Sequence, residues 1–296
     1  MKRNNVRFPL VAIGGLTFLL ACGGENTADN SELSVVDSSS TEMTDEFAAM
    51  FESPESDYQL PSPLQVASIF KKSGLSYNSA ATNKPTNIQK YTTELEQMLN
   101  FGVYSADMAY CVMNEQSNEG RKFLDVITDL AEKIGMEAVF ENKDLIDRFD
   151  KNIENKDSIE FLMIDIHERT ESYVDENDMQ HQQAIHFSGA WTEGMYLGVY
   201  DFEKNPSKEG VGKEISEQML ILENIIKGLK DPKNQGMDID WLIQDMEKIQ
   251  VEFNNFKSVK NYNSEDNTVD ELVLEKSESD ALGKLIKALR NKITKG

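Results

Sequence analysis

Two acidic residues, Asp107 and Glu193, lie inside the most apolar segments of this sequence of 296 residues. A carboxylate among apolar residues must be paired or hydrogen-bonded, or its pKa rises. Two such groups facing one cleft can serve as a general acid and a general base. The alternative is a structural role, in which each carboxylate is held by a tyrosine, a tryptophan N–H or an arginine. The sequence favours the structural role and a protein that is not an enzyme, with Asp107 and Glu193 as weak catalytic candidates.

Aromatic residues in the same two segments form a candidate ligand site. They are Tyr104, Trp191 and Tyr200. A pocket between the two segments would let these rings stack on a small molecule or a peptide. The aromatic residues therefore predict a receptor as one alternative function, with Tyr104, Trp191 and Tyr200 as its weak ligand-binding candidates.

Glycines interrupt both apolar segments, at positions 102, 189, 194 and 198. A glycine inside a helix costs about 1 kcal/mol of helix propensity relative to alanine. Close approach of two crossing helix backbones is the usual compensation for this cost. We therefore expect 99–113 and 184–202 to be the two central, fully packed helices.

Histidine spacing argues against a metal centre. Helical di-iron proteins need a glutamate three positions before a histidine, and none of His167, His181 and His186 has one. His181 and His186 are five residues apart, which does not place them on one face of a helix. Nucleophile elbows, phosphate loops and zinc-hydrolase motifs are also missing from the sequence. We expect no metal and no cofactor.

Two acidic stretches resemble calcium sites only weakly. In 231–236, Lys233 and Gln235 stand at positions where a calcium loop needs acidic or amide ligands. A second group, Asp175, Glu176 and Asp178, lies at an expected helix junction. A weak calcium site there stays open, and a solvated turn is the favoured interpretation.

The elements that must position these residues are expected to be helices. Alternating β-branched runs bounded by tight turns are nearly absent. Apolar residues instead recur at steps of three and four, most regularly at Ile239, Leu242, Met246, Ile249, Phe253 and Phe256. The expected helices span about 63–74, 87–114, 120–134, 143–153, 157–174, 178–202, 213–229, 239–256 and 268–293. We predict an all-α fold, an antiparallel bundle or array of about nine helices, after a disordered N-terminal tether.

The N-terminus has the pattern of a lipoprotein signal. Basic residues precede a fourteen-residue apolar run, 8–21, which is shorter than the about 20 residues that a spanning helix needs. The sequence Leu19-Leu20-Ala21-Cys22 resembles the lipobox of bacterial lipoproteins, which implies cleavage before Cys22 and acylation of this residue, including palmitate. Only one other cysteine occurs, Cys111, and we expect it to be a buried thiol in an apolar stretch.

A strongly acidic spacer follows the lipobox. Residues 23–60 contain ten acidic side chains and no lysine or arginine, in a chain whose formal net charge is −22. Such composition cannot bury enough apolar surface to offset chain entropy, so we expect a disordered tether. A chain of this charge repels phosphate backbones, and nucleic acid is not expected as a partner. The predicted organisation is a signal peptide at 1–21, an acylated cysteine and tether at 22–60, and a helical domain at 61–296.

Three stretches of the domain carry a resemblance. "LPSPLQVASIFKKSGLSYN", "KYTTELEQMLNFGVYSADMAY" and "SGAWTEGMYLGVY" are similar to uncharacterised all-helical outer-membrane lipoproteins of Bacteroidota-type bacteria. The similarity covers about 60–200. It implies an all-helical lipoprotein of the cell envelope and supplies no catalytic residues.

These patterns lead to three functional hypotheses. The first is a lipid-anchored scaffold or interaction domain, a subunit or accessory of an envelope complex with protein partners. The second is a receptor lipoprotein with an aromatic pocket between helices. The third is an enzyme that uses buried carboxylates. Gly23 after the cysteine favours the outer membrane by resemblance to lipoprotein sorting, with the periplasmic and the external face both open.

Overall fold

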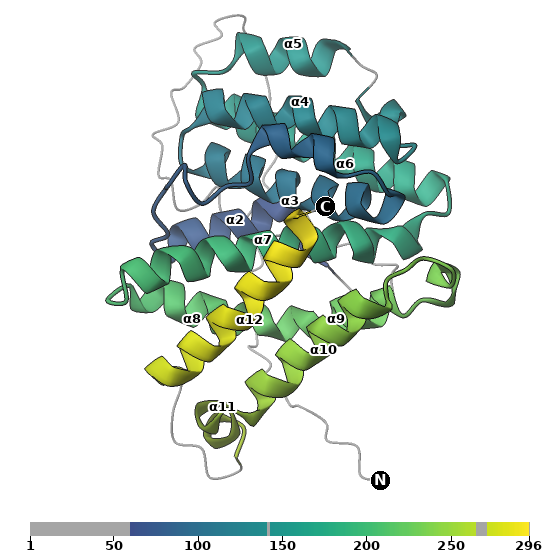
Figure 1. Ribbon diagram of the computed structural model, residues 1–296. Helices are drawn as coiled ribbons and strands as arrows, with labels where there is room; N and C mark the ends of the chain where they lie inside the picture. Colours follow the sequence, from purple (N-terminus) through teal and green to yellow (C-terminus); the bar gives the residue numbers. More distant parts are fainter. Residues whose placement is uncertain (1–59, 141–142, 265–270, 296) are drawn as a thin grey trace, which may run out of the picture. The chain divides into compact units, whose positions relative to one another are not determined.

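The computed structural model describes residues 60–140, 143–264 and 271–295, and these ranges contain helices and no strand (Figure 1). The all-α prediction is confirmed for this part of the chain. The earlier helices are α2 (Pro63–Lys72), α3 (Glu94–Met113), α4 (Ser117–Lys133), α5 (Lys143–Lys151), α6 (Lys156–Glu176) and α7 (Gln180–Lys204). The later ones are α8 (Glu209–Glu217), α9 (Leu222–Leu229), α10 (Asp240–Asn255), α11 (Lys257–Tyr262) and α12 (Lys276–Thr294). The predicted signal peptide, Cys22 and the tether up to residue 59 lie outside the described residues.

Helices α3 and α7 form the centre of the fold. They share the most extensive contact of any helix pair, and α7 also packs against α2, α6, α8, α9 and α12. Both are buried over most of their length, including the largest fully buried side chains, Tyr104 and Trp191. The prediction that 99–113 and 184–202 are the central helices is confirmed.

Glycines permit the close crossing of α3 and α7. A Cβ atom added at Gly102 would lie 1.8 Å from the backbone oxygen of His186. One added at Gly189 would lie 1.9 Å from the backbone oxygen of Leu99. No heavy atom can occupy either position, so the two backbones touch through their glycines. Gly194 differs, because its added Cβ would meet only a Val66 methyl group, at 3.1 Å.

Capping residues decide where several helices begin. Ser62 and Gln65 form a capping box at the start of α2, with Pro63 at its first position. Thr93 and Glu96 form another at the start of α3. The predicted helix at 87–114 is therefore too long, because this box starts a new helix after a 3-10 turn at Pro85–Lys90. Asn155 caps α6, so this helix begins slightly before the predicted start at about 157.

The C-terminal half contains more helices than predicted. The expected helix at 213–229 is divided into α8 and α9 by a 3-10 turn, Gln218–Ile221, and the short α11 follows α10. The fold therefore has eleven α-helices in its described residues instead of about nine. Helix α12 begins at Lys276, with a capping box from Glu275 and Glu278, instead of near 268. Thr268 lies outside the described residues.

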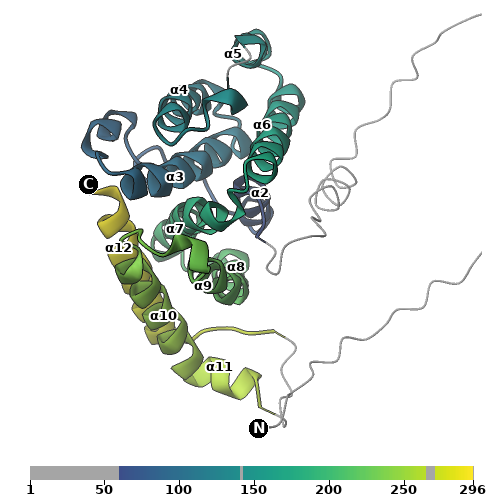
Figure 2. The same cartoon turned by 90° about the vertical axis from the view of Figure 1, so that its right-hand side faces the viewer.

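The regularly spaced apolar residues of 239–256 form a buried seam along α10, as their spacing predicts. All six of its residues are buried, from Leu242 and Met246 to Phe253 and Phe256. Helix α10 uses this face to pack against α9 and α12, and α12 in turn packs against α7. The helices α10 and α12 lie side by side in Figure 1, and in Figure 2 α10 partly covers α12. This contact brings the end of the chain back to the central helices.

Candidate functional site

Glu193 lies on α7 inside the core and pairs with an arginine from α12. Its side chain is 0% exposed, and that of Arg290 is 13% exposed. The guanidinium Nε donates to Oε2 at 2.9 Å and Nη2 donates to Oε1 at 2.9 Å. The same guanidinium stands 4.3 Å from the centre of the Tyr196 ring. This bidentate geometry is the strongest form of an arginine–carboxylate contact, and it joins α7 to α12.

Asp107 lies on α3 and is also fully buried. Its Oδ2 accepts the backbone N–H of Asn83 at 3.0 Å, whereas Oδ1 has no hydrogen-bond partner while the group is ionised. Burial and the negative charge of nearby Glu193 raise the pKa of Asp107 well above its ordinary value, although Arg290 opposes this shift. The protonated carboxyl can donate to Glu193. The proton on Asp107 leaves a single negative charge in the carboxyl pair, on Glu193. The Arg290 guanidinium neutralises that charge.

Further hydrogen bonds surround the carboxyl network, which consists of Asp107, Glu193 and Arg290. The Asn83 side-chain amide donates to the Tyr91 hydroxyl at 2.9 Å. Tyr91 donates to the backbone oxygen of Thr294 at 3.2 Å, and Asn100 donates to that of Ile293 at 3.0 Å. The structure therefore brings Asp107 and Glu193 together, as an enzyme would require, but encloses them. Both carboxyls are buried, and their contacts connect α3, α7 and α12.

Replacing Asp107 by asparagine tests this description. The raised pKa means that Asp107 stabilises the fold most below its ordinary pKa of 3.8, and this stability is lost as the pH rises through the raised value. Asparagine does not titrate and mimics the protonated acid. Near pH 7, we expect the free energy of unfolding of Asp107→Asn to equal that of the parent or to exceed it by up to about 2 kcal/mol. As the pH falls towards about 4, the free energy of unfolding of the parent should rise relative to that of the variant.

Urea unfolding at several pH values measures this difference. His167 and His186 titrate in both proteins, so their contributions cancel in the comparison. Asp107→Leu is the control, because it leaves the Asn83 N–H unpaired and should lower stability at every pH. A pH-independent difference between Asp107→Asn and the parent would contradict the assignment of a buried, protonated Asp107.

The three aromatic candidates have separate structural partners. Tyr104 donates from its hydroxyl to the backbone oxygen of Lys84 at 2.8 Å, and Trp191 donates from Nε1 to that of Gln218 at 3.1 Å. Both side chains are 0% exposed. Tyr200 is half-buried, with the Lys204 ammonium 3.8 Å from its ring centre. None of the three lines either of the adjoining cavities between α2, α3, α4, α6 and α7.

An apolar cleft that was not predicted from the sequence lies between α2, α3, α4, α6 and α7. It consists of two adjoining cavities of about 100 Å³ and about 80 Å³. The residues that line both are Ser62, Pro63, Phe101, Ser105, His167 and Thr170. The larger cavity is otherwise apolar, with Leu124, Ile127 and Phe140 in its wall. The other contains His186, Gln183 and Glu171 and is bordered by Leu60, the first described residue.

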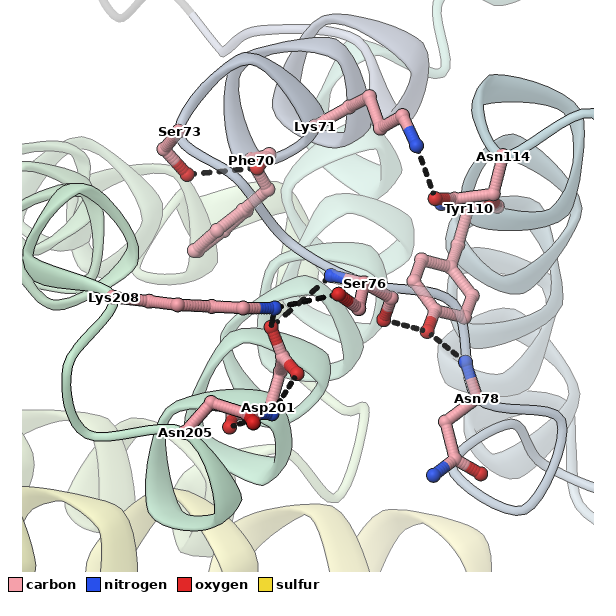
Figure 3. Close-up of polar contacts among 10 residues, drawn as sticks. All are labelled: Phe70, Lys71, Ser73, Ser76, Asn78, Tyr110, Asn114, Asp201, Asn205 and Lys208. Carbon is pink, nitrogen blue, oxygen red and sulfur yellow. Dashed lines mark hydrogen bonds and ion pairs between the residues drawn. The ribbon is translucent and has the colours of Figure 1, made fainter.

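A second feature that sequence reasoning missed is a polar cluster around Asp201 (Figure 3). Asp201 accepts from the Lys208 ammonium at 2.6 Å and from the backbone N–H of Ser76 at 3.1 Å. Lys208 also donates to the Ser76 hydroxyl at 2.6 Å, and Tyr110 donates to the Ser76 backbone oxygen at 2.8 Å. Because this ammonium is a donor to both groups, it does not serve as a base towards the hydroxyl. The cluster fastens the segment after α2 to α7.

The described residues contain no group of three or more histidine, cysteine or acidic side chains that could hold a metal ion. Asp178, from the weak calcium candidate, pairs with Lys233 at 2.7 Å. Cys111 is a free, buried thiol, as predicted, and burial raises its pKa.

Comparisons of the chain with protein-family models, with curated proteins and with solved structures return no match. No helix within the part of the chain that the structure describes is long and apolar enough to cross a membrane.

Proposed function

We propose that this chain is a lipid-anchored protein of the bacterial cell envelope whose helical domain binds partners, as a subunit or scaffold of an envelope assembly. The observation that supports binding over catalysis is the enclosed network of Asp107, Glu193 and Arg290. The residues best suited to acid–base chemistry are used to fasten three helices. Such a domain offers a rigid side-chain surface.

The lipobox and the acidic spacer support the membrane anchor. Acyl chains on Cys22 would bury enough methylene groups to hold the protein on a bilayer without a spanning helix. Gly23 after the cysteine supports the outer membrane as the destination. The tether would let the domain reach on the order of 35 Å from the membrane as a flexible coil.

Replacing Cys22 by serine tests the anchor. We expect the parent protein in the membrane fraction, labelled by palmitate, and Cys22→Ser unlabelled with its signal uncleaved. Fractionation, palmitate labelling and intact mass measure these outcomes. Cys111→Ser is the matched control, because Cys111 is buried and should leave labelling unchanged. A palmitate-labelled Cys22→Ser protein would contradict the proposal.

Purification with partners tests the scaffold role. The tagged protein, at native level, is extracted with a gentle detergent, and mass spectrometry identifies the proteins that accompany it. We expect a stoichiometric set of outer-membrane partners. A protein that emerges alone would contradict the scaffold.

A receptor for a small molecule is the second candidate, and the cleft between α2, α3, α4, α6 and α7 favours it. This cleft is distinct from the predicted aromatic site at Tyr104, Trp191 and Tyr200. It has an apolar interior and a polar end, as ligand sites in proteins commonly have.

A further inference from the structure

The polar end of the cleft contains a buried histidine whose hydrogen bonding is incomplete. His186 is 7% exposed, and its Nε2 has no partner. Its ring packs against Phe101, with 5.4 Å between ring centres, and both residues line the cleft. A buried polar atom without a partner costs about 1–3 kcal/mol. Nε2 itself has almost no accessible surface, so a ligand in the cleft reaches it, and recovers part of that cost, only when the side chains over it shift.

The wall of the cleft limits the charge of such a ligand. None of the described residues that line either cavity is a lysine or an arginine, and Glu171 is the one acidic residue among them. Burial lowers the pKa of His186 and of His167 to about 4, so both imidazoles are neutral near pH 7. An anionic ligand would find no cation to pair with, and a cationic one would have only Glu171, whose pKa is raised by burial.

The interior of the cleft limits the size and shape. The two adjoining cavities, of about 100 Å³ and about 80 Å³, are comparable in volume to a cavity of about 150 Å³ that binds benzene. Phe101, Met108, Leu124 and Phe140 offer contacts for an apolar body. Ser105 and His167 lie where the apolar part meets the polar end, because they line both cavities.

We propose that the cleft between α2, α3, α4, α6 and α7 binds an uncharged molecule with an apolar body the size of a benzene ring and one hydroxyl group, which reaches Nε2 of His186 after a small side-chain movement and hydrogen-bonds to it. The inference rests on the second candidate function and is independent of the anchor. Its test does not involve Cys22, so failure of one does not imply failure of the other.

The test compares three probes that share one ethyl-substituted ring: 4-ethylphenol, ethylbenzene, which lacks the hydroxyl, and 4-ethylbenzoate, which is charged. The full chain is kept soluble in an amphipathic polymer, which needs no acyl anchor, with histidines labelled for nitrogen NMR. The sequence has 3 histidines, so the imidazole spectrum is simple. His181, which lines neither cavity, is the internal control.

We expect 4-ethylphenol to shift the Nε2 signal of His186 and to leave that of His181 in place. One hydrogen bond should make 4-ethylphenol bind about 3- to 10-fold more tightly than ethylbenzene, with 4-ethylbenzoate the weakest of the three. His186→Leu should remove the preference for the phenol while ethylbenzene still binds.

A cavity-filling pair of variants locates the binding. Ser105→Phe should abolish binding of both uncharged probes. Thr128→Phe is the matched control, because each hydroxyl donates to the backbone oxygen four residues earlier and each side chain is half-buried, while Thr128 lines neither cavity. Equal binding by both variants would overturn the proposal, as would tighter binding of the carboxylate.

Occupation of the cleft by a segment of the chain itself would also overturn the proposal. The tether joins the domain at Leu60, which borders the cleft, and carries Phe47, Met50 and Phe51. If the probes bind only after deletion of 43–57, the cleft holds the chain's own segment and not a small molecule.

Discussion

Gly102→Ala and Gly189→Ala are each expected to destabilise the protein by about 3 kcal/mol or more, with loss of the folded state as the extreme result. The new methyl groups would lie 1.8 Å and 1.9 Å from backbone oxygen atoms of the opposite helix. A backbone atom cannot turn aside as a side chain can, so α3 and α7 must separate. Because these helices share the largest contact of the fold, separation loosens packing along both.

Gly194→Ala on the same helix is the control. Its new methyl would meet only a Val66 methyl group at 3.1 Å, which a small side-chain movement relieves. Alanine also gains about 1 kcal/mol of helix propensity over glycine, so we expect a change within about 1 kcal/mol. Urea unfolding followed by circular dichroism measures all three variants. If Gly102→Ala and Gly194→Ala have equal stability, the helices do not cross as described.

Arg290→Met is the second variant with a large expected effect, a loss of about 3–5 kcal/mol. It leaves the carboxylate of Glu193 buried among apolar residues without its bidentate partner. Glu193→Gln should cost less, because Arg290 is 13% exposed and can turn towards water. The double variant with methionine at both positions should recover much of the loss, because it removes both charges together.

The control for Arg290→Met is Lys287→Met on the same helix. Lys287 pairs with Glu203 at the surface, where the two side chains are 34% and 39% exposed. Such pairs contribute about 0–1 kcal/mol. Equilibrium unfolding of the single and double variants gives the coupling energy of the buried pair. A coupling no larger than that of the surface pair would contradict a structural role for the carboxyl network.

Some features of this fold depend on residues that are close together in the chain, and these features were predicted from the sequence. The seam at 239–256, the buried Cys111 and the crossing through Gly102 and Gly189 were all predicted, because residue spacing and glycine placement express helix geometry directly. The capping box at Thr93 and Glu96 starts α3, so the helix predicted from residue 87 is too long. The break between α8 and α9 was not predicted, since its apolar face continues without interruption.

The partner of each buried charge was decided by the tertiary structure. The sequence showed that Asp107 and Glu193 needed partners and offered several arginines. Arg290 is 97 residues from Glu193, and their pairing depends on how α12 crosses α7. Arg121 and Arg169 pair instead with Asp150 and Asp165.

Composition, periodicity and glycine placement by themselves determined the helical class and the two central helices, whereas the lipoprotein proposal rests on the resemblance of residues 19–22 to a lipobox. These features depend on residues that are close together in the chain. The enclosure of the carboxyl pair and the position of the cleft depend on four or more helices meeting at particular angles. Such angles follow from side-chain packing over the whole domain, so only the tertiary structure could place Asp107 and Glu193 in a closed network and His186 in an open cleft.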